Sequence, residues 1–169
     1  DDAVSIQKTD RGFRLGVHIA DVSYYVAENS WLDREALERG ISIYYSDGVI
    51  PMLPVELSNN LCSLKPEVER PTISVLIDYD KDGVVLNHRI FSSIIKSCKR
   101  FSYDEAWKLL QSGDVDGKYA TTFPSLKFMH HFSRVLRKKR ILEGSINFHI
   151  SEPDIRVLPN DQIEDVVVA

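Results

Sequence analysis

Two apolar, β-branched segments separated by a short turn most constrain the fold of this sequence. Residues 72–79 and 84–91 are rich in Val and Ile, and Asp82 and Gly83 lie between them. Asp-Gly is a preferred pair in the tight turns that join antiparallel strands, because glycine readily adopts the positive φ that such turns need. The pattern therefore predicts a β-hairpin in the middle of the chain.

Further strands are expected before and after this hairpin. The first two would be joined by a turn at residues 9–12, where Asp and Gly are turn formers. Residues 22–26 continue in β-favouring side chains, and short apolar runs recur near the C-terminal end. The expected strands are residues 3–8, 13–19, 145–150, 155–158 and 163–168.

Three helices are expected from their capping residues. Ser30 is placed to cap a helix over Trp31–Arg39, with Asp33 positioned to return a hydrogen bond, and Gly40 ends it. Ser102 and Glu105 form a second capping box, opening a helix through Leu110. The longest helix, residues 124–143, ends at Gly144 and carries an apolar stripe of Leu126, Met129, Phe132, Val135 and Leu136.

These elements predict one α+β domain over residues 1–169. Its sheet would be mixed or antiparallel, with hairpins flanked by helices, and not a doubly wound βαβ repeat. Residues 41–56 are expected to be irregular, because Pro51 and Pro54 exclude long regular structure there.

The charge distribution is uneven. A net charge of −4 argues by itself against nucleic-acid binding. However, residues 127–140 of the expected long helix contain six basic residues and no acid: Lys127, Arg134, Arg137, Lys138, Lys139 and Arg140. These residues fall largely off the apolar stripe, and they fit either a solvated face or contact with a phosphate backbone.

Composition also bears on the compartment. No apolar run approaches the roughly 18 residues that a membrane-spanning helix needs, so no membrane partner is expected. Cys62 and Cys98 lack the spacing of a metal or redox motif and are expected to be buried free thiols. Free thiols indicate a reducing compartment, hence the cytoplasm.

Two sets of residues could carry chemistry. Asp1 and Asp2 are adjacent carboxylates, and carboxylate oxygens are the ligands that Mg²⁺ prefers. Two such ions about 4 Å apart assist phosphodiester hydrolysis; the alternative is a solvated terminal pair. His18 and Asp21 could bind metal or do acid–base work, but a local hydrogen-bonded pair that fixes the exit of a strand is favoured.

Aromatic residues could contact nucleobases. Tyr44 and Tyr45 lie beside the proline-containing segment, and Phe148 interrupts a polar stretch. Exposed aromatic rings stack on bases with about 1–3 kcal/mol each. Taken singly, each of these side chains is more often part of the core than of a binding site.

Three motifs in order resemble the RNB domain of the ribonuclease II and ribonuclease R type. They are DDAVS at residues 1–5, GVHIADVSYYV at 16–26 and VIPMLPVELSNNLCSL at 49–64. The resemblance extends to about Ile150 and on towards the end of the chain. It implies a processive hydrolytic exoribonuclease that uses Mg²⁺ and releases nucleoside 5′-monophosphates from the 3′ end of single-stranded RNA.

The resemblance also assigns roles to residues. Asp1 and Asp2 match the last two positions of the family's four-aspartate motif and would be catalytic metal ligands. Tyr44 matches the tyrosine that packs against the 3′-terminal base, with Tyr45 as the neighbouring alternative. Phe148, in GSINF at 144–148, matches the phenylalanine that stacks on that base from the other side.

Parts of the family pattern are absent from this sequence. Two further aspartates would precede Asp1, phosphate-gripping arginines would follow Ala169, and oligonucleotide-binding-fold (OB-fold) domains would be supplied by a parent chain. The isolated chain is therefore expected to be a poor nuclease. A non-catalytic RNA-binding module on the same scaffold is the main alternative, and an unrelated α+β structural domain is the third.

Overall fold

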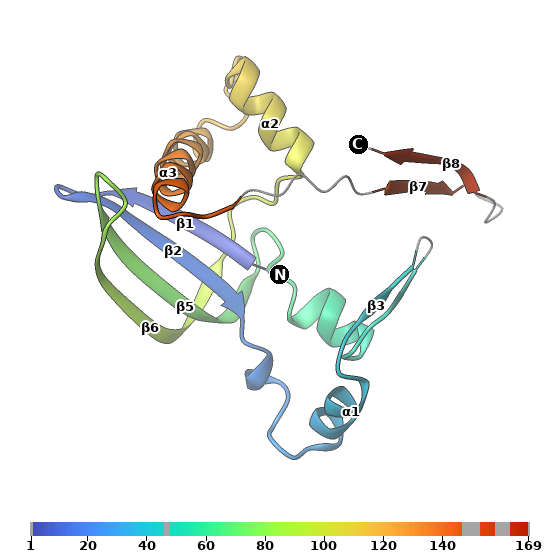
Figure 1. Cartoon of the computed structure of the whole chain (residues 1–169). Coiled ribbons are helices and arrows are strands. Elements are labelled where there is room, and N and C mark those ends of the chain that lie inside the picture. Colours follow the sequence, from blue (N-terminus) through green and yellow to red (C-terminus); the bar gives the residue numbers. More distant parts are fainter. Residues whose placement is uncertain (1, 46–47, 147–152, 158–162, 169) are drawn as a thin grey trace.

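A four-stranded antiparallel sheet forms the centre of the chain in the computed structural model, which describes residues 2–45, 48–146, 153–157 and 163–168 (Figure 1). The strand order is β1-β2-β5-β6, so the two outer strands are β1 and β6. The strands are β1 (Asp2–Lys8), β2 (Gly12–Ala20), β5 (Glu69–Asp80) and β6 (Val85–Lys96).

The central hairpin is confirmed, and its strands are longer than the sequence pattern indicated. Asp80 organises the turn, because its Oδ1 accepts hydrogen bonds from the backbone N–H groups of Asp82 and Val84 at 2.9 and 2.8 Å. Gly83 has a φ of 79°, the left-handed conformation that favours glycine. Gly83 is therefore at the turn as predicted, while the aspartate that accepts the turn's hydrogen bonds is Asp80 and not Asp82.

The expected helix caps are also confirmed. Ser30 accepts a hydrogen bond from the N–H of Asp33 at the start of α1 (Trp31–Arg39), and Ser102 accepts one from Glu105 at the start of α2 (Tyr103–Ser112). The carboxylate of Asp33 accepts from the N–H of Asn29. The long helix, α3, covers Phe123–Leu142.

Three expectations needed correction. Residues 22–26 do not continue as a strand, because Asp21 caps a short 3₁₀ helix, η1 (Val22–Tyr24). Within the irregular segment, β3 (Ile43–Tyr44) pairs with β4 (Val49–Ile50). Residues 145 and 146 are not in a strand, and the rest of the expected strand at 145–150 lies outside the described residues.

The C-terminal hairpin is present. The strands β7 (Pro153–Val157) and β8 (Ile163–Val168) pair antiparallel, as the sequence indicated. Figure 1 shows this hairpin on the same side of the central sheet as β3 and β4. The chain therefore has the α+β architecture expected, with an antiparallel sheet, hairpins and flanking helices.

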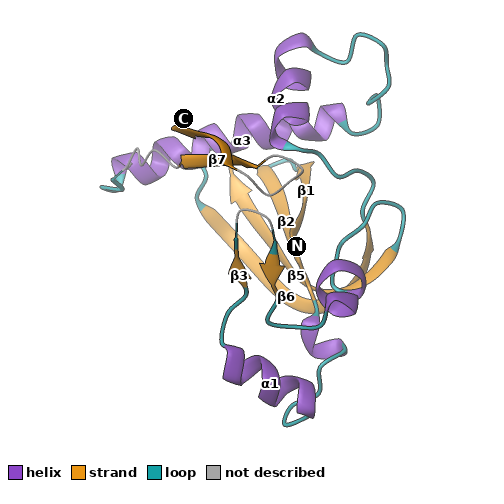
Figure 2. Ribbon diagram, turned by 90° about the vertical axis from the view of Figure 1, so that its right-hand side faces the viewer, coloured by secondary structure: helices purple, strands orange, loops and turns teal. Residues whose placement is uncertain are grey.

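Each face of the central sheet has its own small core. On one face, Ile6 and Phe13 pack against Phe132 of α3, which is only 2% exposed. Phe132 also packs against Tyr79 of β5, with ring centroids 5.0 Å apart. Figure 2 shows α3 lying across the sheet while α1 stands away from it.

The second core lies on the opposite face. It joins Ala20 at the end of β2 to the segment after β4, which includes the short π-helical turn η2 (Leu57–Leu61). Its buried side chains are Ala20, Leu57, Cys62 and Leu64. The proline-containing motif thus folds back under the sheet and fixes the end of β2 near which the candidate site lies.

Candidate active site

Asp2 is the first residue of β1, at the corner of the sheet. It pairs with Ile19 of β2 and is exposed. Alternate residues of a strand share a face, so Asp2 lies on the same face as Val4 and Ile6, the face that α3 partly covers. Asp1 lies outside the described residues.

The described residues supply only part of a site for Mg²⁺. Carboxylate oxygen is the right donor type for this cation, and Asp2 offers one such group in an exposed position. However, the part of the chain that the structure describes holds no group of three or more His, Cys, Asp or Glu side chains able to bind a metal ion. Asp2 is thus a suitable type of ligand for Mg²⁺, but the described residues provide too few such ligands to hold the ion.

Asp21 has a structural role at the end of β2. Its carboxylate accepts hydrogen bonds from the Ser23 hydroxyl at 2.6 Å and from the N–H of Tyr24 at 3.2 Å. Its own N–H donates to the carbonyl of Pro71. Asp21 thereby turns the chain out of the sheet.

His18 forms a separate network. Among the described residues its hydrogen bonds go to Ser74 and Ser5 and not to Asp21, so the expected local pair is wrong. Its Nδ1 lies 2.6 Å from Ser74 Oγ, and its Nε2 lies 3.1 Å from Ser5 Oγ. Ser74 contacts Ser93 Oγ at 2.5 Å, and Ser93 contacts Thr72 Oγ1 at 2.8 Å. His18 therefore helps to link all four strands of the sheet.

Partial burial disfavours the charged form of this histidine. Desolvation lowers the pKa of His18 below its ordinary value of 6.5. A neutral imidazole can donate from one nitrogen and accept at the other, which suits two serine hydroxyl partners. His18 is thus a structural element of the sheet near the start of β1.

Tyr44 lies on the short strand β3, opposite Val49, and its side chain is 77% exposed. Tyr45 is 52% exposed, and its N–H donates to the carbonyl of Gly48. Neither ring is buried within this chain, so both are accessible in it. Phe148, the second expected aromatic contact, lies outside the described residues.

The sequence analysis missed two polar contacts that hold β2 to β5. One is the serine network around His18, and the other is an ion pair in which Arg14 donates to both oxygens of Asp78, at 2.6 and 3.0 Å. Arg14 holds the pKa of Asp78 below its usual value. Correct register would have revealed both, since His18 faces Ser74 and Arg14 faces Asp78.

The two cysteines differ from each other. Both are free, and Cys62 is buried as expected, whereas Cys98 is exposed. Cys98 follows the end of β6 (Val85–Lys96). In the described part of the chain no helix is long and apolar enough to cross a membrane.

Comparison with known proteins identifies relatives along the whole chain. The family model of the RNB domain matches residues 1–169. Ribonuclease R 1 of Lactococcus lactis subsp. lactis (strain IL1403) is 45% identical over 163 residues, which cover 93% of this chain and 20% of that protein. The chain thus spans about a fifth of this relative's length.

Solved structures share the fold. RNase R of Mycoplasma genitalium in complex with double-stranded RNA superposes with a TM-score of 0.94 at 34% identity, over 99% of this chain and 30% of that one. Yeast Ssd1, described as a pseudonuclease, has a TM-score of 0.71 at 23% identity over 84% of this chain and 17% of its own. The second likeness shows the fold alone.

Proposed function

The chain belongs to the RNB domain family, and we propose that it is part of an exoribonuclease that degrades single-stranded RNA from its 3′ end. The reaction would be processive hydrolysis that releases nucleoside 5′-monophosphates. The match of the RNB domain to every residue of the chain carries this proposal. The exposed carboxylate of Asp2, at the family's aspartate position, agrees with it.

We propose Asp1 and Asp2 as two of the carboxylates that hold Mg²⁺, with the remaining ligands supplied from beyond this sequence. When bound, such ions stabilise charge on the oxygens of a phosphodiester. Asp2 is held in place by the pairing of β1 with β2. His18 and Asp21 keep that corner rigid through their bonds to serines and to η1.

Tyr44 is proposed to contact the 3′-terminal base, with Phe148 on the other side of the same base. An exposed ring at a hairpin presents its face without having to leave a core, and stacking contributes about 1–3 kcal/mol per base. RNA as the ligand is supported by the complexes of Mycoplasma genitalium RNase R with double-stranded RNA and with ribose-methylated single-stranded RNA.

Tyr44→Ala in the full-length protein tests this contact, with Tyr45→Ala as the matched control. We expect Tyr44→Ala to lengthen the final undegraded oligonucleotide more than it slows the chemical step. Denaturing gels of end products would show this directly. The same end product from both variants and the unsubstituted protein would remove Tyr44 from the RNA contact.

A non-catalytic RNA-binding module is the second candidate. The fold occurs in yeast Ssd1, so the fold by itself does not decide between nuclease and binding module. Sequence upstream of Asp1 in the parent protein does: aspartates two and eight positions earlier favour the enzyme, and other residues there favour the binding module.

The experiment that tests the proposed function uses the full-length protein and a 5′-labelled single-stranded RNA. We expect a ladder that shortens from the 3′ end, stops on chelation and resumes when Mg²⁺ is restored. Cleavage at internal positions, or RNA binding without cleavage in Mg²⁺, would contradict the proposal. The isolated 169-residue chain, which has only two of the proposed carboxylates, should be inactive in the same assay.

We also propose which domains accompany this chain and in which compartment it works. OB-fold RNA-binding domains of the parent chain would deliver RNA to the site. The free state of Cys62 and Cys98 agrees with a reducing cytoplasm.

A further inference from the structure

The outward face of α3 gathers the basic residues of this helix. Phe132 is 2% exposed, and Met129, Val135 and Leu136 pack around it, which defines the inward face. With 3.6 residues per turn, five basic or histidine side chains fall on the opposite face, beside the apolar Ile141. We call them the α3 cationic strip: Lys127, His130, Arg134, Arg137 and Lys138.

The cations of this strip differ from their basic neighbour Lys139. Lys139 donates to the carbonyl of Gly83 and lies 3.7 Å from Glu143, so it ties α3 to the β5–β6 turn. In contrast, the ion pairs found within the described residues include none to Arg134, Arg137 or Lys138. The helix itself has no acidic residue. The strip therefore carries uncompensated positive charge on a chain whose net charge is −4.

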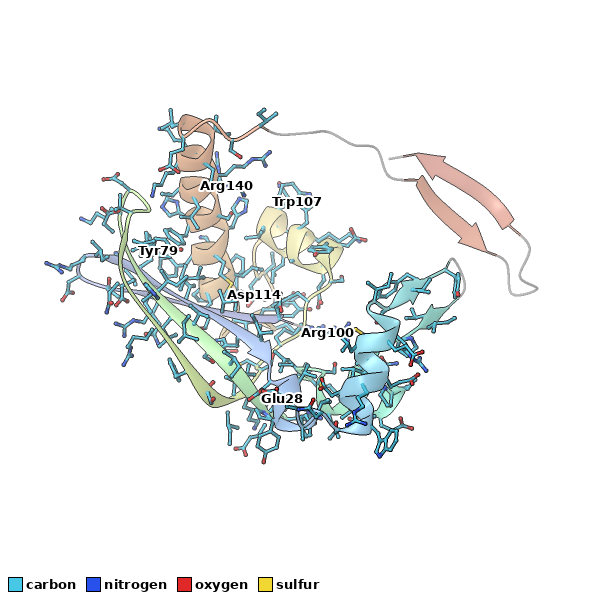
Figure 3. The ribbon with its side chains drawn as sticks, turned by 60° about the horizontal axis from the view of Figure 1, so that its bottom comes forward. Glu28, Tyr79, Arg100, Trp107, Asp114 and Arg140 are labelled. Atoms are coloured by element: carbon cyan, nitrogen blue, oxygen red, sulfur yellow. The ribbon has the colours of Figure 1, made fainter. Side chains whose placement is uncertain are left out.

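A groove lies along one end of the strip, and an exposed aromatic ring lies at the other end. A shallow groove of about 340 Å³ is lined by its three C-terminal cations together with Ile141 and Leu142. At the other end, Trp107 of α2 lies 6.4 Å from His130, ring to ring, and is 56% exposed. Figure 3 shows Trp107 on α2 beside α3. From Lys127 to Lys138 the cations extend over about 16 Å of helix, at about 1.5 Å per residue.

We propose that the α3 cationic strip, with Trp107, binds the phosphate backbone of RNA outside the active site. The inference rests on the proposed function, because it assumes that RNA is the ligand of this protein. Arginine forks match phosphate oxygens in pairs, and the lysines add point charges. An exposed indole can stack on a base of any sequence. The strip would bind the part of the RNA strand that has not yet reached Asp2. It should therefore increase the affinity for long RNA more than the affinity for short RNA.

The test uses the full-length protein carrying Asp2→Asn, so that RNA is bound without being degraded. One variant adds Arg134→Gln, Arg137→Gln and Lys138→Gln. The matched control adds Arg11→Gln, Arg34→Gln and Lys118→Gln, which removes the same charge from exposed positions outside the strip. Fluorescence anisotropy measures affinity for a long single-stranded RNA, and for an oligonucleotide too short to reach beyond the active site, over a range of salt concentrations.

We expect the strip variant to lose affinity for long RNA at least tenfold more than for the short oligonucleotide. For this variant, the slope of log affinity against log salt concentration should become shallower by about 2. Each phosphate contact on a single strand contributes about 0.7 to this slope, and the variant lacks three cations. Trp107→Ala should weaken long-RNA binding severalfold without changing the salt slope. The control should match the unsubstituted protein within twofold.

Three results would overturn the inference. These are equal losses for long and short RNA, an unchanged salt slope in the strip variant, or the same loss in the control. If the strip variant bound RNA as tightly as the unsubstituted protein, the inference would be wrong, and an acidic protein would be the better candidate partner for the strip. Failure of the proposed function is separately visible, because the active full-length protein would then not shorten RNA from its 3′ end even with an intact strip. Circular dichroism confirms that each variant is folded.

Discussion

The two ends of one sheet face differ sharply in this molecule. Ile6 and Phe13, at the end under α3, are 8% and 9% exposed. Val4 and Ile19 lie on the same strands and the same face, yet they are 53% and 48% exposed. The sequence pattern is equally apolar at both ends, so the difference comes from the helix that covers only one of them.

The uncovered end of this face extends onto the outer strand β6. Ile90 and Ile94 of β6 continue this apolar surface and are 65% and 70% exposed. β6 is also an outer strand with one unpaired side over 12 residues, the kind of edge that pairs with other chain segments. Asp2 lies at the same uncovered end, so the candidate site is at the part of the sheet that α3 does not cover.

Removing the ring at the covered end should have the largest effect. Phe132→Ala deletes a side chain enclosed by Phe13 and Tyr79 at centroid distances of 4.8 and 5.0 Å. We expect a loss of about 3–5 kcal/mol in the free energy of unfolding. Val4→Ala, at the uncovered end, should cost less than about 1 kcal/mol, because little contact is lost. Urea unfolding of the purified variants measures both, and similar losses would break the comparison.

An intermediate effect is expected in the polar network that links the strands. His18→Leu deprives the Ser74 and Ser5 hydroxyls of a partner, and the cost should be about 1–3 kcal/mol. The matched change His88→Leu, on the exposed edge strand β6, should cost less than about 0.5 kcal/mol. Equal costs, measured by urea unfolding, would show that the network contributes nothing to the sheet.

The same histidine gives the stability a pH dependence. The pKa of His18 is lowered in the folded state, so the unfolded state binds more protons as the pH falls below its ordinary value of 6.5. The contribution of His18 is therefore complete above that value and lost as the pH falls through the lower pKa of the folded state. His18→Gln should flatten this part of the stability profile. An unchanged profile would show that His18 is solvated.

The smallest effect on folding is expected at the open edge. Ile90→Lys with Ile94→Lys should change the free energy of unfolding by less than about 1 kcal/mol, because both side chains are largely solvated. Self-association of the 169-residue chain should fall, since charge on an edge strand opposes pairing. Sedimentation velocity measures this. Association that persists unchanged would show that the uncovered face does not attract other chains.

Local features were predictable from the sequence, and long-range ones were not. The turn at Gly83 and the caps at Ser30 and Ser102 depend on neighbouring residues, so the pattern fixed them correctly. The network of His18 with Ser74 needed the register between strands 56 residues apart. The exposure of Cys98 depended on where the core ends.

For the candidate site too, the sequence predicted some features and only the structure shows the others. Asp2 and Tyr44 were identified by resemblance to the RNB domain, and only the structure shows that both are exposed. The supporting roles of His18 and Asp21 were expected, but their partners were not, because those partners come from other segments of the chain.

The most direct test compares two aspartates at opposite ends of the β1–β2 hairpin in the full-length protein. Asp2 starts β1, and Asp10 lies in the turn at its far end, exposed. Asp2→Asn should lower the rate of 3′-end degradation by roughly 100-fold or more, because a lost metal ligand removes several kcal/mol of charge stabilisation. Asp10→Asn should leave the rate within twofold. Equal rates for the two variants would contradict an active site at the uncovered end of the sheet.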